Sequence, residues 1–203
     1  MKKIAFFSTF VQPFGKKYSL TYKNGIMFTE NEIIDGCLKN DRKMQKALYD
    51  RYAPKLYALC LRYAYSKDEA DDILQESFVK IFFQISQFSR EHSFYGWLKS
   101  VAINTAITYY HHHKKHYYQD DIDEINETEI ENNTIEGEYS AEHLLQVIQE
   151  LPTGFRTIFN LYAIEGYKHQ EIAEMLNISE STSKSQLLRA RKALQTKLEQ
   201  LQE

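Results

Sequence analysis

The C-terminal stretch 181–198 combines cationic and hydrogen-bonding side chains at helical spacing. It contains five basic residues and no acidic residue, and at 100° per residue Thr182, Ser185 and Arg189 lie opposite an apolar stripe that includes Leu187. Hydroxyl and guanidinium groups near the start of a helix can read base edges, and basic groups farther along can hold phosphates. The pattern predicts a DNA-reading helix, the alternative being a basic helix that only faces solvent. Its candidate contacts are Thr182, Lys184, Ser185, Leu188, Arg189 and Lys192.

The residues before this stretch supply the rest of a helix-turn-helix pattern. A short helix is expected over 169–176, with Ala173 and Leu176 on its inward side. A tight turn at Asn177 follows, and Ser179 is suited to cap the next helix. A small residue where two helices cross, with a turn four residues later, is typical of helix-turn-helix proteins.

Periodicity predicts another helix over residues 68–85, with two contrasting faces. The first face is apolar and consists of Ile73, Leu74, Phe78, Ile81, Phe82 and Ile85. The second mixes carboxylates with apolar side chains and consists of Asp72, Gln75, Glu76, Val79 and Phe83. Because Val and Phe are unusual on a purely solvated face, this second face is predicted to contact a protein partner. The alternative for Phe83 is packing under the preceding loop.

A third helix, roughly 94–113, belongs to an aromatic-rich segment. Its aromatic residues and their neighbours are Phe88, Phe94, Tyr95, Trp97, Tyr109 and Tyr110, and the basic cluster 111–116 follows. Aromatic rings beside basic groups suit stacking on unpaired bases. Packing in a protein core would account for most of the same rings, so the sequence pattern is compatible with both base stacking and core packing.

Composition indicates that these helices belong to an all-α protein. The chain has 203 residues and 24.0 kDa, with 43% hydrophobic and 26% charged residues, which is ordinary for a folded chain. Only seven Gly and three Pro are present, which favours long helices over a turn-rich sandwich or barrel. The two cysteines, Cys37 and Cys60, cannot form a disulfide framework, in keeping with a cytoplasmic location. No apolar stretch approaches the length of a membrane span.

Charge is strongly segregated along the chain. Residues 1–26 carry five Lys and no acid, and we expect a disordered basic extension there, with Met27 as an alternative start. Lys2-Lys3 and the apolar run after them imitate a signal peptide, but no cleavage pattern follows. Residues 117–142 carry ten acidic residues and no basic one, as in an extended solvated linker. Two small helical domains joined by an acidic flexible linker are therefore expected.

Four stretches, in this order, resemble the extracytoplasmic-function sigma factors of bacterial RNA polymerase, which belong to the sigma-70 family. They are Ala47–Tyr57 (ALYDRYAPKLY), Asp68–Lys80 (DEADDILQESFVK), Phe94–Ala106 (FYGWLKSVAINTA) and Leu151–Leu194. The resemblance implies sigma domain two over 27–116, the linker over 117–141 and sigma domain four over 142–203. It also implies a non-enzymatic factor that directs core RNA polymerase to promoters and initiates transcription.

The resemblance gives each predicted surface a partner. Asp72, Gln75, Glu76, Val79 and Phe83 correspond to the surface that binds core polymerase. Contacts to the promoter −10 element fall on Tyr95, Trp97, Asn104, Thr105 and Tyr109. Contacts to the −35 element fall on the six candidates in 181–198. An anti-sigma factor is a further expected partner, whereas no cofactor, metal ion or membrane insertion is expected.

The chain also departs from the family pattern. Ser181-Thr-Ser-Lys replaces the usual Gly-Thr-Val-Lys, and Asn177 replaces a turn glycine. Tyr95 stands where Arg is frequent and Thr108 where Asp is frequent. These differences leave the expected fold intact and bear on which promoter sequence is read.

Two other classes of protein compete with this interpretation. One is a helix-turn-helix regulator with an unrelated helical N-terminal domain, which would not need the mixed face of helix 68–85. The other is a metal enzyme using His112 and His116, together with His111 or His113. No HExxH frame is present, and the adjacent lysines would repel a cation.

Overall fold

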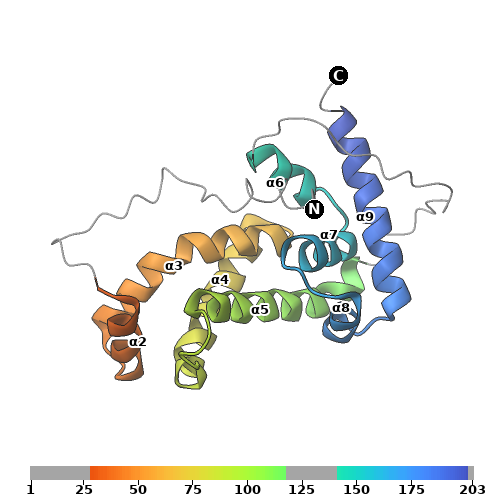
Figure 1. The fold of residues 1–203 in the computed structure, drawn as a ribbon. Helices are drawn as coiled ribbons and strands as arrows, with labels where there is room; N and C mark the ends of the chain where they lie inside the picture. The colour runs from red at the N-terminus through yellow and green to blue at the C-terminus, as the bar shows by residue number, and fades with distance from the viewer. Residues whose placement is uncertain (1–27, 118–140, 201–203) are drawn as a thin grey trace. The chain divides into compact units, whose positions relative to one another are not determined.

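The computed structural model describes residues 28–117 and 141–200, and every element in these ranges is helical (Figure 1). The chain divides into two compact units, and the boundary between them lies within one long helix, after Ala106. The elements are α2 (Glu30–Leu38), α3 (Arg42–Tyr63), α4 (Lys67–Gln84), the 3₁₀ turn η2 (Ile85–Gln87), α5 (Phe94–Tyr117), α6 (Ala141–Gln149), α7 (Thr153–Phe159), the π-helical turn η3 (Asn160–Ile164), α8 (His169–Leu176) and α9 (Glu180–Gln200). The expected all-α fold is confirmed. The basic extension and nearly all of the acidic linker lie outside the described residues.

Side-chain caps set the starts of α2, α3 and α4 in the first unit. Thr29 and Glu32 form a reciprocal capping box at α2, in which the Thr29 N–H donates to Glu32 Oε2 at 2.7 Å. The Asp41 carboxylate caps α3 by accepting from Lys43 N at 2.7 Å, and Ser66 Oγ caps α4 by accepting from Glu69 N. Each cap satisfies an N–H group that the first turn would otherwise leave unpaired.

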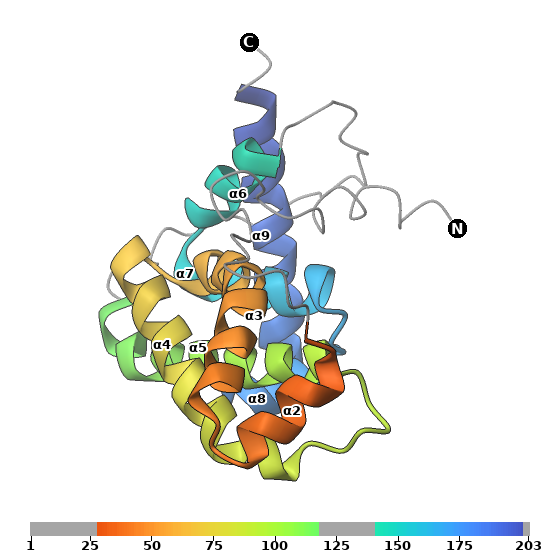
Figure 2. The ribbon, with the colours of Figure 1, turned by 90° about the vertical axis from the view of Figure 1, so that its left-hand side faces the viewer.

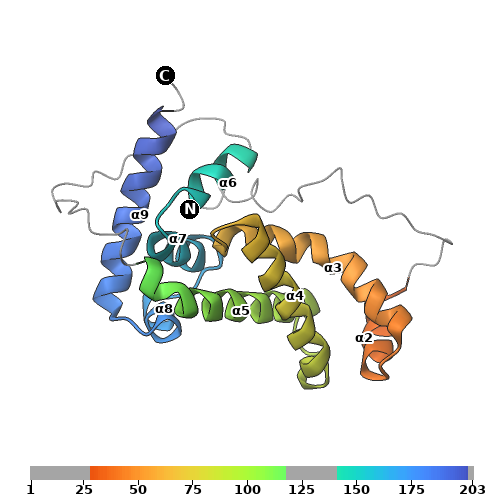
Figure 3. The same cartoon turned by 180° about the vertical axis from the view of Figure 1, so that it is seen from behind.

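Helix α3 continues through Pro54 as a single 22-residue element (Figure 3). A proline inside a helix favours a kink or a break, but α3 is not broken at Pro54. Proline removes one main-chain hydrogen bond inside a helix. The helix buries Leu48 and Tyr52 before Pro54, and Leu56 and Leu59 after it, so apolar packing stabilises both halves.

Helices α2, α4 and α5 all pack against α3 in the first unit (Figure 2). Tyr49 of α3 meets Phe78 of α4 with 4.6 Å between ring centroids. Tyr52 of α3 meets Phe94 at the start of α5, edge to face, at 5.7 Å. These contacts fix α4 and the first turns of α5 on one scaffold, leaving the opposite face of α4 free of this core.

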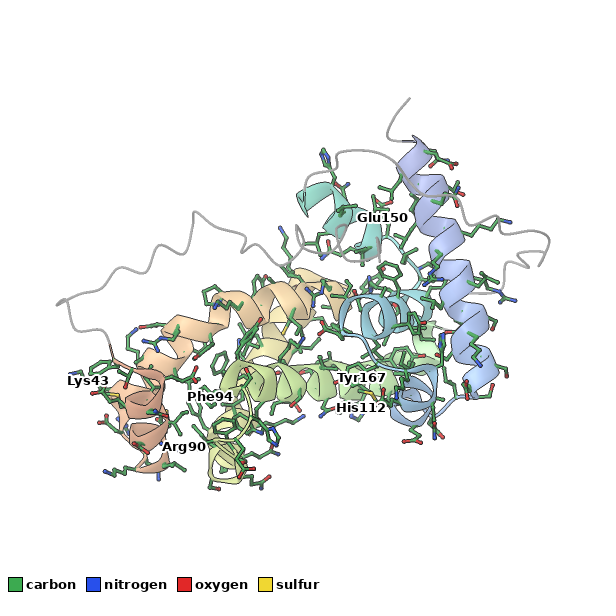
Figure 4. All side chains as sticks on the ribbon, viewed as in Figure 1. Lys43, Arg90, Phe94, His112, Glu150 and Tyr167 are labelled. Atoms are coloured by element: carbon green, nitrogen blue, oxygen red, sulfur yellow. The ribbon has the colours of Figure 1, made fainter. Side chains whose placement is uncertain are left out.

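Helix α9 is the long element of the second unit and packs against α6, α7 and α8. Its buried residues are Ser183, Leu187, Ala190, Leu194 and Leu198, which confirms the predicted apolar stripe. Glu150, labelled in Figure 4, directly follows α6. Its Oε2 lies 2.8 Å from Lys197 Nζ of α9. None of the helices in the described ranges has the length and apolarity needed to cross a membrane.

A buried arginine, Arg156 of α7, organises the junction between α6 and α7. Only 1% of its surface is exposed, and its Nη1 donates to the main-chain oxygen of Gln149 at 2.7 Å. The last carbonyls of a helix lack partners within the helix, so this guanidinium satisfies one of them. Apolar periodicity in the sequence did not predict that Arg156 is buried, because a cationic residue at a core position interrupts the apolar pattern.

Candidate nucleic-acid interface

The helix-turn-helix is built as the sequence predicted. Asn177 ends α8 in the left-handed region, with φ 51° and ψ 56°, a conformation that Asn tolerates better than most residues. Ile178 N then donates to the carbonyl of Ala173 at 3.0 Å. Ser179 Oγ accepts from Thr182 N at 3.0 Å and so caps α9. The turn therefore delivers the first residues of α9 in an ordered arrangement.

All six candidates on α9 lie away from its buried stripe. Lys184 and Leu188 are exposed, and the other four are half-buried: Thr182, Ser185, Arg189 and Lys192. Lys184 Nζ lies 2.6 Å from Glu180 Oε1 one turn earlier, an exposed pair. Leu188 is an apolar side chain, 41% exposed, among cations, which suits contact with a thymine methyl group. The face thus combines hydrogen-bonding groups, cations and one apolar side chain.

The second predicted surface lies on the outer face of α4. Asp72 and Gln75 are exposed, and Glu76 is half-exposed, with Oε1 2.7 Å from Lys80 Nζ. Val79 is 53% and Phe83 is 83% exposed. The alternative packing of Phe83 under the preceding loop is wrong. We call these five residues, Asp72, Gln75, Glu76, Val79 and Phe83, the α4 stripe.

An aromatic cluster forms at the start of α5. Phe94 is buried and stacks on Trp97 with 5.9 Å between centroids, and Phe88 from the preceding loop contacts both rings. Tyr95 is half-buried, lies nearly parallel to Tyr52, and has Lys55 Nζ 5.4 Å from its ring centroid. Core packing therefore holds Phe94, while Trp97 and Tyr95 keep part of their surface exposed.

Two of the α5 candidates, Asn104 and Thr105, have opposite environments. Asn104 is exposed, whereas Thr105 is fully buried and donates its hydroxyl to the Val101 carbonyl at 2.9 Å. The structure therefore places Thr105 in the core rather than beside Asn104, because successive residues of a helix point about 100° apart. Tyr109 is half-buried.

A contact between distant parts of the chain holds the loop before α5. Arg90 Nη2 is paired with Asp35 of α2, and its Nη1 donates to Asn31 Oδ1 at 3.4 Å (Figure 4). The loop also carries Phe88 into the aromatic cluster. These partners lie more than fifty residues apart in the sequence, so no local pattern could have indicated the contact.

The histidines at the end of α5 are only partly described. His111 and His112 are exposed, while the side chains of His113 and His116 fall outside the described residues. Within the described part of the chain, no three His, Cys, Asp or Glu residues gather closely enough to hold a metal ion.

Comparison with known proteins supports both helical units. The family model "Sigma-70 region 2" matches residues 48–116, and "Sigma-70, region 4" matches residues 141–194. These two ranges contain the α4 stripe and the candidate faces of α5 and α9.

Proteins described as ECF RNA polymerase sigma-E factors are similar over most of their length. That from Salmonella typhimurium is 30% identical over 85% of this chain and 96% of its own, and that from Haemophilus influenzae is 28% identical over 85% and 97%. A solved structure of the sigma factor RpoE from Bartonella quintana, in complex with the anti-sigma factor NepR, matches with a TM-score of 0.48 and 20% identity, over 76% of this chain and 96% of that one. The chain belongs to the extracytoplasmic-function sigma factors of the sigma-70 family.

Proposed function

We propose that this sigma factor binds core RNA polymerase through the α4 stripe and reads promoter DNA through α5 and α9. The observation that carries the proposal is the exposure of Val79 and Phe83 on the same helix face as the Asp72 and Glu76 carboxylates, inside the region 2 match. An aromatic side chain that is 83% exposed contributes little apolar burial to the stability of the free protein. A partner that covers it would remove this apolar surface from water.

We further propose a division of labour along the chain. Residues 27–116 act as sigma domain two and residues 142–203 as sigma domain four, joined by the acidic residues 117–141. Nine acidic residues without a basic one would be repelled by DNA phosphates, so the linker is expected to stay off the duplex. The chain acts by binding rather than catalysis, in the cytoplasm, under control of an anti-sigma factor.

Reading of the −35 element is assigned to α9. Arg189 would make a bidentate contact to guanine, worth about 1–3 kcal/mol of discrimination. Thr182 and Ser185 would form hydrogen bonds to bases, and Leu188 would contact a thymine methyl group. Lys184 and Lys192 would hold phosphates, each adding about 0.9 to the salt slope of binding.

Reading of the −10 element is assigned to the exposed part of α5. Asn104 has an amide that can read a base edge, and Trp97, Tyr95 and Tyr109 retain ring surface for stacking. Thr105 is left out of this surface because it is buried and donates to Val101. Its substitution is expected to act on the fold of α5.

The test of α9 compares Arg189→Ala with Lys192→Ala in the holoenzyme, using a duplex library randomised over the −35 region. Arg189→Ala should relax preference at one position. Lys192→Ala should weaken all sequences nearly alike and reduce the salt slope by about 0.9. If Lys192→Ala changes base preference and Arg189→Ala does not, the proposed orientation of α9 in the groove is wrong.

The helix-turn-helix regulator considered from the sequence is not favoured. Such a protein has no need for the α4 stripe, and both sigma-70 regions match in their expected order. Copurification with core polymerase distinguishes the two classes.

A further inference from the structure

The first residue of α8, His169, contacts two other elements of the second unit. Its Nδ1 lies 2.9 Å from Ser183 Oγ of α9, and Ser183 is fully buried. Its ring stacks on Tyr162 of η3, with 4.4 Å between centroids and 22° between planes. Arg191 of α9 lies over the same tyrosine, with its guanidinium carbon 5.8 Å from the ring centroid.

These contacts attach α9 at two points within the stretch 182–192 that carries its DNA-reading candidates. Ser183 directly follows Thr182 and precedes Lys184, and Arg191 lies eight residues later, about two helical turns. Ser183 lies in the same first turns of α9 as Thr182 and Ser185. A change at the Ser183 contact would therefore move or rotate the groups that face the bases.

We propose that His169 is a positioning residue for the DNA-reading face of α9, acting through Ser183 and Tyr162. The inference rests on the proposed reading of the −35 element by α9. We do not propose that His169 itself contacts a base. A positional error of about 1 Å at a recognition surface is enough to lose directed hydrogen bonds, because their strength falls steeply with distance and angle.

The charge of His169 provides a readout that a purely structural residue would not give. From α9, Lys184, Arg191 and Glu180 act electrostatically on the ring, and from η3 Tyr162 stacks on it. Burial lowers the pKa of His169, Lys184 and Arg191 lower it further, and Glu180 opposes them. The imidazole is thus neutral at pH 7.5. As the pH falls below 6.5, its protonation places a third cation beside Lys184 and Arg191, which disfavours the native arrangement.

The experiment first selects a preferred −35 duplex with the wild-type holoenzyme, then measures its affinity relative to a scrambled duplex. His169→Phe keeps an aromatic ring for Tyr162 and loses Nδ1, while Ser183→Ala removes the partner hydroxyl. Each should lose about two- to tenfold of the preference, the range of one net hydrogen bond. His169→Asn, which offers a hydrogen-bonding atom near the position of Nδ1, should recover at least half of it.

The wild-type preference should also decrease between pH 7.5 and pH 5.5, and this decrease should be absent in His169→Phe. Comparing two duplexes cancels the general attraction of a protonated histidine to phosphates. Circular dichroism of each variant records folding separately. Unchanged preference in Ser183→Ala and a flat wild-type pH profile would overturn the inference. A wild-type holoenzyme that enriches no −35 sequence would instead overturn the proposed reading by α9.

Discussion

Truncating Phe83 to alanine should separate binding of core polymerase from folding. The side chain is 83% exposed, so its removal should change the free energy of unfolding by less than about 0.5 kcal/mol. Fully burying a phenylalanine is worth about 1.5–3 kcal/mol, and nearly all of that gain is still available in the free protein. A loss of about 2 kcal/mol on docking corresponds to about a 30-fold weaker Kd for core polymerase.

The assay is titration of labelled full-length chain with core polymerase, with thermal unfolding measured in parallel. Tyr65→Ala is the matched control, because Tyr65 is also a large, 75% exposed aromatic residue and lies outside the α4 stripe. It should bind core polymerase like the wild type. Equal Kd values for Phe83→Ala and the wild type, or equal losses in both variants, would refute the assignment of this surface.

Two further predictions concern residues whose burial decides the outcome. Asn104→Ala should reduce open-complex formation, measured by permanganate reactivity, more than closed-complex binding, whereas Thr105→Val should leave the ratio of the two unchanged because Thr105 is buried. Arg156→Met should lower the free energy of unfolding by about 1.5–3 kcal/mol in denaturant titrations, because it removes a charged donor from the Gln149 carbonyl.

Periodic apolar residues predicted most of the fold. The faces of α4 and α9 follow directly from spacing, since a 3.6-residue repeat determines which side of a helix is buried. The turn at Asn177 and the Ser179 cap were also predicted, because both depend on local main-chain chemistry. The exposure of Val79 and Phe83 agreed with their place among carboxylates.

Other features depend on tertiary packing, which spacing does not specify. A proline inside a helix favours a kink or a break, but buried residues on both sides of Pro54 sustain α3. Thr105 was grouped with Asn104 because of the family resemblance, and packing places it in the core. Arg156 and Arg90 contact other elements of the fold, and no repeating pattern in the sequence indicates these contacts.

Run-off transcription decides whether this chain directs core RNA polymerase to promoters. Core RNA polymerase would be incubated with the purified full chain over a promoter library from the source genome. We expect discrete transcripts that require the chain and share upstream sequence near −35 and −10. It also predicts that combined charge reversal of Asp72 and Glu76 abolishes them while leaving the helical circular dichroism intact. A chain that binds DNA by itself, fails to bind core polymerase and supports no transcript would contradict the account.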